Sequence, residues 1–393
     1  MKHAPPRLVQ SPDAIRAIAQ TLRGVEMVAV DTEFVRETTF FPKVGLLQIA
    51  TEKETWLIDP LALDAKALGP LFEVLKAPEI LKVMHAAYAD QECFYWAYGF
   101  VAEPVLDTSI GAALCGLGDS IGLGKLVKEA FQIVLPKGRA RTKWLNRPLG
   151  PELLHYAEQD VLHLVRLGQW LRDRLKKKDR WDWALEESRV DESTLDVSPE
   201  DMARRLLKNG RVSGKAVGVL VELVRWREQR ARSGNMPRGW VADNDTLMDL
   251  ARVAPSRVEE LRTFRGLNGR EADKSGRAIL EAIERGRHLK FEGFVPLGFS
   301  PSDEKEDHLS VFVKTYISFL ADSHGIANRF LLQTGRATAL VRMADCDISE
   351  WVKAELLSER AADLIGAELK ALLCGEKGLA IQDGQVVILD LRK

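Results

Sequence analysis

The stretch that most restricts the fold is the apolar run over residues 27–30, which leads directly into Asp31 and Glu33. A continuous run of this kind is typical of a strand that is buried on both faces of a sheet. Because strand side chains alternate between faces, Asp31 and Glu33 are expected to project to the same side, roughly 6 to 7 Å apart. Such a pair needs a counter-charge, which a hard divalent metal ion can supply. The alternative is that Asp31 caps a turn and Glu33 is solvated, because this pattern is common.

The surrounding sequence predicts an α/β domain over residues 1–180. Three closely spaced strands with short connections predict an antiparallel meander, and the later alternation of strands and helices predicts parallel strands. The sheet is therefore expected to be mixed and covered by helices. The expected elements are a helix over 11–22, strands over 27–31, 44–51 and 55–58, a helix over 65–76, a strand over 80–84 and helices over 91–98 and 109–114.

Further acidic residues stand where elements of this domain begin. Asp90 sits where the helix after the fourth strand would start, which also makes it a candidate N-cap. Asp107 precedes a helix of small residues, and for Asp107 the N-cap interpretation is kept. Tyr156 and Asp160 are four residues apart on an expected helix whose first turn holds Pro151. That spacing presents a tyrosine and a carboxylate on one helical face.

A basic segment over residues 136–148 precedes that helix and contains no acidic residue. A run of this kind is either a solvated face or a contact for a phosphate backbone, and the sequence favours neither. Its basic residues are Lys137, Arg139, Arg141, Lys143 and Arg147, with Trp144 among them.

The composition sets the broad class of protein. With 46% hydrophobic and 29% charged residues among 393, the chain is expected to be a soluble protein of two or three domains. The N-terminus lacks an apolar signal segment, and no long apolar run occurs elsewhere, so a secreted or membrane-spanning protein is not expected. The four cysteines are far apart, which indicates neither a zinc site nor a disulfide framework. A cytoplasmic location is therefore expected.

The second half of the chain reads as helical. A charged stretch over 181–210 is interpreted as a linker, followed by a helical domain over 211–292 and a second, diverged copy over 300–393 that ends in a hairpin turning at Asp383-Gly384. Residues 211–290 hold 17 basic and 11 acidic residues, a net charge of +6, which suits a nucleic-acid contact or a basic solvated surface. The expected helices cover 216–232, 245–254, 256–263, 271–285, 308–322, 327–334, 337–343, 348–356 and 358–373.

The separate motifs together resemble the DEDD exonucleases, in the branch whose third motif carries a tyrosine, and within it the ribonuclease D family. The matching segments are Asp31-Thr32-Glu33-Phe34 with Gly45 to Gln48, His85-Ala86 with Asp90, Arg141-Thr142-Lys143-Trp144, and Tyr156 to Asp160. The resemblance implies a ribonuclease H-like, mixed-sheet exonuclease domain. One or two helical bundles of the helicase-and-RNase-D C-terminal (HRDC) type are expected to follow it.

The resemblance also implies a site with two divalent cations, Mg²⁺ or Mn²⁺, and no organic cofactor. In the implied arrangement Asp31 contacts both ions, Glu33 and Asp160 hold the ion that activates water, and Asp90 supports the other. Tyr156 has an ordinary pKa near 10 and is a poor base at neutral pH, so its implied role is to orient the attacking water.

Substrate contacts are expected from a second group of residues. Phe34 and Gln48 are expected to contact the terminal nucleotide, by stacking and by hydrogen bonding, although ordinary packing is the alternative for both. His85, Arg141 and Trp144 are further expected substrate-binding residues.

The expected function is a 3′ to 5′ exoribonuclease that releases 5′-mononucleotides. The family implies RNA with a free 3′ end as the partner, with tRNA precursors as substrate and no membrane. A DNA exonuclease of the same chemistry and a catalytically silent RNA-binding protein are the alternatives. Retention of all five expected catalytic residues argues against the silent protein. Residues 86–89 and Lys143 depart from the family pattern, which bears on substrate preference more than on activity.

Overall fold

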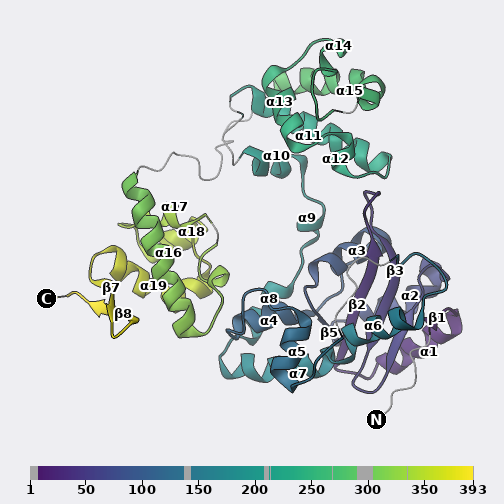
Figure 1. Ribbon diagram of the computed structural model, residues 1–393, viewed down its shortest axis with the longest axis horizontal. Helices are drawn as coiled ribbons and strands as arrows, with labels where there is room; N and C mark the ends of the chain where they lie inside the picture. Colours follow the sequence, from purple (N-terminus) through teal and green to yellow (C-terminus); the bar gives the residue numbers. More distant parts are fainter. Residues whose placement is uncertain are drawn as a thin grey trace.

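A mixed β-sheet lies at the centre of the N-terminal α/β domain in the computed structural model of the chain (Figure 1). The structure describes residues 8–136, 143–207, 212, 214–267, 269–289, 304–333 and 335–392. Within them the sheet has six strands in the order β1-β4-β3-β2-β5-β6. The strands are β1 (Leu8–Val9), β2 (Met27–Val35), β3 (Lys43–Ala50), β4 (Thr55–Ile58), β5 (Leu81–Met84) and β6 (Val105–Asp107).

The strand directions confirm the expected mixed sheet. β2 and β3 pair antiparallel, as do β3 and β4, whereas β5 runs parallel to both β2 and β6. The central strand is longer than expected, because β2 continues past Asp31 to Val35, where it still pairs with Lys43 of β3. A shift in register between Glu33 and Phe34 marks a bulge within this pairing.

Helices cover both faces of the sheet, and the alternation along β2 decides which side chain meets which layer. Val28 and Val30 pack with α1, α2 and α3 on one face, whereas Met27 and Ala29 point to the face covered by α4 and α7. Asp31 therefore follows Ala29 onto the second face. The helices are α1 (Pro12–Leu22), α2 (Ala65–Lys76), α3 (Tyr88–Tyr98), α4 (Thr108–Leu114), α5 (Leu123–Phe131), α6 (Pro151–Leu162) and α7 (Leu164–Lys177).

The stretch expected to be a linker, over 181–210, is mostly helical where it is described. It forms α8 (Trp181–Ser188), α9 (Glu192–Leu195) and α10 (Pro199–Leu207). Trp183 is buried with α4 and α7 in the α/β domain, whereas Leu207 is buried in the helical core that follows. The many charged residues lie on the outer faces of these short helices, and apolar stripes lie on the inner faces. The high charge therefore led to the prediction of a linker instead of helices.

The first helical body, defined here as residues 199–288, is built around a long central helix, α11. Its Gly218 meets α15 so closely that a Cβ there would collide with the backbone oxygen of Gly286, which explains glycine at this crossing. The segment expected to be helical over 256–263 contains only the single turn of α14. The elements after α10 are α11 (Ala216–Ser233), α12 (Arg238–Val241), α13 (Asn244–Val253), α14 (Val258–Leu261) and α15 (Gly269–His288).

The C-terminal body, defined as residues 304–390, combines helices with the expected hairpin. The turn holds Asp383 and Gly384 at positive φ, which confirms the predicted turn position. The helix expected over 327–334 is only a 3-10 turn, and the domain boundary expected between residues 292 and 300 lies outside the described residues. Its elements are α16 (Glu304–His324), η1 (Asn328–Phe330), α17 (Ala337–Arg342), α18 (Ile348–Lys353), α19 (Glu359–Leu373), β7 (Lys377–Gln382) and β8 (Gln385–Asp390).

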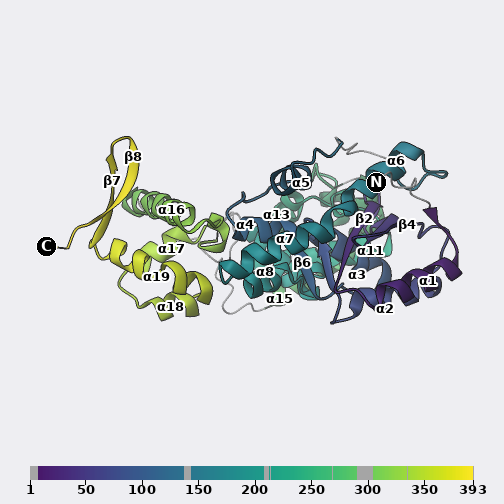
Figure 2. The ribbon, with the colours of Figure 1, turned by 90° about the horizontal axis from the view of Figure 1, so that it is seen from below.

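The C-terminal body packs on the α4–α8 end of the α/β domain (Figure 2). Arg180 donates hydrogen bonds to the carbonyl oxygens of Leu114 and Gly325, at 2.8 and 2.9 Å. The Trp183 and Phe330 rings meet edge to face, and one continuous apolar cluster spans both parts. Among all described helices, none combines the length and the apolar character needed to cross a membrane.

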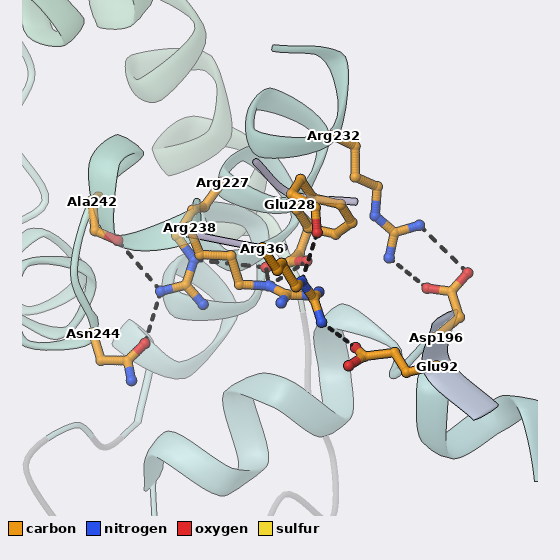
Figure 3. Close-up of polar contacts among 10 residues, drawn as sticks. Arg36, Glu92, Asp196, Arg227, Glu228, Arg232, Arg238, Ala242 and Asn244 are labelled. Carbon is orange, nitrogen blue, oxygen red and sulfur yellow. Dashed lines mark hydrogen bonds and ion pairs between the residues drawn. The ribbon is translucent and has the colours of Figure 1, made fainter. Parts of the chain in front are cut away.

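The first helical body instead holds the loop over residues 36–42, which joins β2 to β3. Phe40 at the tip of this loop is only 2% exposed and belongs to the apolar core of the helical body. The side-chain oxygen of Asn235 accepts hydrogen bonds from the backbone N–H groups of Phe40 and Phe41, both at 3.1 Å. Figure 3 shows Arg36, paired with Glu92, close to Arg238.

Candidate active site

Two carboxylates of the candidate site come from the central strand. Asp31 and Glu33 lie on β2, two residues apart, and both are half-buried. Their pairing partners on β3 are Gln48 and Leu46. The side-chain amide of Gln48 donates a long hydrogen bond of 3.4 Å to Asp31. The strand alternation thus brings both acidic groups to one face, as the sequence predicted.

The third carboxylate, Asp90, reaches the strand from the first turn of α3. β5 pairs with β2 only as far as Ala29, so the backbone N–H of Thr32 is not used by that neighbouring strand. Asp90 accepts a hydrogen bond from this N–H at 2.9 Å and another from the Thr32 hydroxyl. The cap residue of α3 is Ala87, so the alternative reading of Asp90 as an N-cap is wrong.

The fourth carboxylate and the tyrosine come from α6, which packs across β2, β3 and β4. Pro151 occupies the first turn of this helix, as expected. Tyr156 and Asp160 lie one turn apart, and the tyrosine hydroxyl hydrogen-bonds with the carboxylate. α6 contacts β2, and the charge of Asp160 raises the pKa of both Asp31 and Glu33.

Burial raises the pKa of every carboxyl group in this cluster, and repulsion from other members raises the pKa values of Asp31 and Glu33 further. Burial is the largest cause for Asp31, followed by the charges of Asp90, Asp160 and Glu33, and its pKa lies well above the usual range. Burial with the charges of Asp160 and Asp90 raises the pKa of Glu33 to about 8. Burial also raises the pKa of Asp90 to about 7 and that of Asp160 to about 6, although each accepts a stabilising hydrogen bond.

The donor set suits hard divalent cations. Within the described residues, no group of three or more His, Cys, Asp or Glu side chains is arranged so that it could hold a metal ion. The four carboxylates nevertheless offer only oxygen donors, and no basic side chain of the described chain is among the main influences on their pKa values. This concentration of uncompensated negative charge is what a divalent cation would neutralise.

Gln48 is completely buried beside the carboxylates. Its side-chain oxygen has no hydrogen-bond partner among the described residues, while its nitrogen faces Asp31. A buried amide oxygen without a partner is costly, so this group is well placed to receive a donor from a bound molecule. Because the side chain has no exposed surface in this structure, its expected contact with the terminal nucleotide stays a prediction.

Trp144 does not lie on the open surface of the site, which corrects the expectation that it contacts substrate. Its side chain is 4% exposed and packs in a small apolar cluster beneath α6. The ring lies 6.3 Å from that of Tyr156, centroid to centroid. Gly45 of β3 lies against the same residue, because a Cβ there would be 2.7 Å from the Trp144 carbonyl oxygen. Trp144 therefore supports the tyrosine from below.

Arg147, from the basic segment, has a structural partner rather than an open face. Its guanidinium group holds the buried carboxylate of Asp59 with two hydrogen bonds, of 2.8 and 2.5 Å. It also donates to the carbonyl oxygens of Gly45 and Trp144, at 2.6 and 2.9 Å. Arg147 thus anchors the described end of the segment to β3 and to the end of β4.

Of the remaining expected substrate residues, the structure describes His85 and Phe34, and neither forms a hydrogen bond with the four carboxylates. His85 follows β5, and its Nδ1 lies 2.8 Å from the hydroxyl of Thr108. That hydroxyl donates to the carbonyl of Met84, so Nδ1 carries the proton in this contact. Phe34 is half-buried beyond the β2 bulge. Arg141 lies outside the described residues, as do Lys137 and Arg139.

Three positioning residues were not singled out from the sequence. Thr32 holds Asp90, Asp59 holds Arg147, and Gly45 leaves room for Trp144. Thr32 and Gly45 lie within the motifs quoted from the sequence, and that position is the signal by which they could have been identified. Asp59 follows the strand expected over 55–58, and nothing near it in sequence points to a partner 88 residues away.

Comparisons with known proteins agree with this geometry. The profile of the 3′-5′ exonuclease family matches residues 6–176, and the profile of the HRDC domain matches residues 217–283. The fold and the carboxylate cluster therefore define a metal-dependent 3′-5′ exonuclease with an HRDC region. The expected fold class, a mixed-sheet exonuclease domain followed by helical domains, is confirmed.

Full-length relatives identify the family. The chain is 33% identical over 384 residues to the ribonuclease D of Nitrobacter hamburgensis, covering 97% of this chain and 98% of that protein. It is 31% identical over 392 residues to the ribonuclease D of Zymomonas mobilis, covering 98% of each. This chain belongs to the ribonuclease D family, whose members are 3′-5′ exoribonucleases.

A solved structure supports the same assignment over the whole chain. The crystal structure of Escherichia coli RNase D, described as an exoribonuclease involved in structured RNA processing, superposes with a TM-score of 0.79 at 27% identity. The match covers 95% of this chain and 99% of that one. The expected enzyme class is thus confirmed, and the family implies divalent metal ions.

Proposed function

We propose that this exoribonuclease removes nucleotides one at a time from RNA 3′ ends at the carboxylate cluster, releasing 5′-mononucleotides. The observation that carries this proposal is the gathering of four carboxylates at β2. Asp31 and Glu33 lie on the strand, and Asp90 accepts a hydrogen bond from the N–H of Thr32. Asp160 lies on α6, which packs across the same strand. Asp31 experiences the charges of the other three and is the group proposed to contact both of two divalent ions. Bound there, such ions supply water activation and neutralise the charge that develops on the phosphate.

The protein side chains have separate proposed tasks. Burial, together with the charges of Asp160 and Glu33, raises the pKa of Tyr156, so its hydroxyl remains protonated at neutral pH. The group is therefore a hydrogen-bond donor that orients the attacking water, and it does not act as the base. Thr32 fixes the direction of Asp90, and the unpartnered oxygen of Gln48 is offered to the terminal nucleotide.

The proposed substrate is a precursor RNA with a 3′ extension, tRNA precursors foremost, in the cytoplasm. Support comes from the E. coli neighbour, whose described role is structured RNA processing. The division of labour proposed for the chain assigns catalysis to residues 1–180. The region 211–292 is proposed as an accessory RNA-binding domain, for which the net charge of +6 over 211–290 is the main argument.

A paired assay tests this function. Purified full-length protein with Mg²⁺ or Mn²⁺ is given a tRNA precursor with a 3′ trailer, a short single-stranded RNA and a DNA of matched sequence. We expect mononucleotides from both RNAs, with the Asp31→Ala variant inactive and the Asp173→Asn variant active, because Asp173 is exposed on α7. Faster degradation of DNA, or binding without hydrolysis, would overturn the proposal.

A further inference from the structure

A pocket on the first helical body has no role in the chemistry described above. It lies between α12 and the segment that leads into α15, and its volume is about 640 Å³. The side of the pocket formed by α12 presents Trp240, whose side chain is 57% exposed. The lining residues are Met236, Gly239, Trp240, Arg265, Gly266, Arg270 and Glu271.

α12 is held in place by residues other than Trp240. The neighbouring Val241 is completely buried in the helical core, and Arg238 forms an ion pair with Glu228 of α11 at 2.7 Å. These two contacts fix the short helix from its inner side. The indole of Trp240 is left as a large, amphipathic surface at the pocket, and an aromatic ring of this kind stacks well on a nucleobase.

The charge of the pocket is positive. Arg265 and Arg270 are both exposed, and within the described residues no carboxylate pairs with Arg265. The acidic residue of the lining, Glu271, is neutralised by a bidentate contact with Arg230, of 2.6 and 3.0 Å. It also accepts a hydrogen bond from Ser275. An anionic group entering beside Arg265 therefore meets little repulsion.

The floor of the pocket is rigid. A Cβ at Gly266 would collide with the hydroxyl of Thr246, so the backbone at Gly266 lies directly against the start of α13. That start is fixed in turn, because Asp243 caps the helix by accepting a hydrogen bond from the N–H of Thr246 at 2.7 Å. The pocket is thus preformed, which lowers the entropic cost of binding a flexible chain.

The pocket has a fixed position relative to the carboxylates. The turn before α12 contains Asn235, which binds the loop over residues 36–42, and the guanidinium of Arg238 lies 4.7 Å from the ring of Phe40. That loop continues β2, the strand that carries Asp31 and Glu33. Figure 1 shows α12 close to the loop end of β2 and β3.

We propose that this pocket binds an unpaired nucleotide of the RNA substrate, upstream of the 3′ end that is being cut, with its base stacked on Trp240 and its phosphate at Arg265. The inference rests on the proposed function for the identity of the ligand as RNA. Stacking tolerates every base, so the site increases affinity without selecting sequence. The loop contact keeps this nucleotide at a set distance from Asp31, so the site engages only an RNA long enough to reach it.

Binding as a function of RNA length tests the proposal. In the uncleaving Asp31→Asn background, the Kd is measured by fluorescence anisotropy for labelled single-stranded RNAs of about 4 to about 16 nucleotides that share one 3′ end. We expect affinity to rise in a step once the RNA spans both sites. Trp240→Ala should remove the step, raising the Kd of long RNAs about tenfold, and Trp240→Phe should retain it. Arg265→Gln should reduce the salt dependence of binding.

Two matched controls separate the pocket from general effects. Val253→Ala removes another exposed apolar side chain of the same body, and Arg277→Gln removes one exposed positive charge outside the pocket. Both should leave the length step unchanged. The proposal is overturned if Trp240→Ala leaves the length step intact, or if this substitution weakens binding of the shortest RNAs as much as binding of the longest. A length step that depends on Trp240 supports nucleotide binding at the pocket even if the wild-type protein hydrolyses no RNA. The absence of hydrolysis would overturn only the proposed function.

Discussion

At the scale of single residues, the carboxylate cluster places function in conflict with stability. Burial raises the pKa of all four members, and the charges of the other members raise the pKa values of Asp31 and Glu33 further. A group whose pKa is higher in the folded state than in the unfolded state stabilises the protein below its unfolded pKa. That contribution is lost as the pH rises through the folded value. The pKa of Glu33 is raised from its ordinary value of 4.5 to about 8 in the folded protein. The metal-free protein should therefore lose stability as the pH rises from about 4.5 to about 8.

Replacing Asp31 with Asn should expose this conflict. The variant cannot ionise at the centre of the cluster, so in a chelator at pH 8 we expect it to unfold about 2 to 4 °C above the wild type. The difference should shrink at pH 4, where the carboxyl groups are protonated. Mg²⁺ should raise the melting temperature of the wild type more than that of the variant, and hydrolysis should be lost.

Differential scanning fluorimetry across pH, with chelator or Mg²⁺, provides the measurement. Asp173→Asn serves as the control, because Asp173 is exposed on α7 and is not one of the four clustered carboxylates. Equal Mg²⁺-induced shifts in the wild type and Asp31→Asn would show that Asp31 does not hold the cation.

At the scale of elements, the position of α6 depends on a close contact between β3 and the segment before the helix. Gly45 touches the backbone of Trp144, and Arg147 joins the same segment to Asp59. Asp59 is only 1% exposed. Burial alone would raise its pKa, but hydrogen bonds from Arg147, Gln10 and the N–H of Leu61 outweigh it and lower the pKa. The buried pair thus fixes the support on which Tyr156 rests.

A methyl group at Gly45 should disturb this support. In Gly45→Ala the new Cβ would meet the Trp144 carbonyl oxygen at 2.7 Å, and the segment must shift. We expect a loss of about 1 to 3 kcal/mol in the free energy of unfolding and a fall in kcat, because Tyr156 moves with Trp144. Denaturant unfolding and steady-state hydrolysis of a short RNA measure the two effects.

Gly69→Ala is a suitable comparison for this substitution. Gly69 lies inside α2, and nothing is within 4 Å of its added Cβ, so the change should be neutral or mildly stabilising. A Gly45→Ala enzyme with an unchanged kcat would mean that the position of Trp144 does not matter for catalysis.

At the scale of the whole molecule, both helical bodies share their packing with the exonuclease domain. Phe40 belongs to the core of the first helical body, and Phe330 of the C-terminal body contacts Trp183. Cutting the chain near residue 210 would therefore expose apolar surface on the exonuclease domain. Such a truncation cannot separate RNA binding from folding, and point variants at these contacts are the better probes.

The contact at the β2–β3 loop offers one such probe. Asn235 has a positive φ, so Asn235→Gly removes the side-chain acceptor without backbone strain. Leaving a buried N–H group without its partner costs about 1 to 3 kcal/mol, and a smaller cost is expected here because the Phe40 contact is part-buried and the Phe41 contact is exposed. We expect the first helical body to unfold at a lower temperature than the exonuclease domain, as a separate transition in calorimetry.

Hydrolysis of short RNAs should change little in this variant, because β2 is still paired with β3 along its length. Asn328→Ala, at an exposed position in the C-terminal body, should give a calorimetric unfolding profile with a single transition, like that of the wild type. If Asn235→Gly also unfolds as the wild type does, the loop contact does not couple the two parts.

The sequence by itself determined those features that depend on local periodicity. Alternation along β2 placed Asp31 and Glu33 on one face, and the four-residue spacing on α6 joined Tyr156 to Asp160. The Asp107 cap and the Asp383-Gly384 turn were likewise predictable, because caps and turns need particular side chains or φ angles within a few residues.

Tertiary structure alone decided the features that join distant segments. The burial of Trp144, the pairing of Arg147 with Asp59 and the seating of Phe40 against Asn235 depend on which surfaces meet after folding. A charged stretch such as 181–207 becomes helical for the same reason, since its apolar stripes gain stability only against neighbouring cores. Local sequence carries little information on such contacts, because their energy comes from partners that may lie a hundred or more residues away.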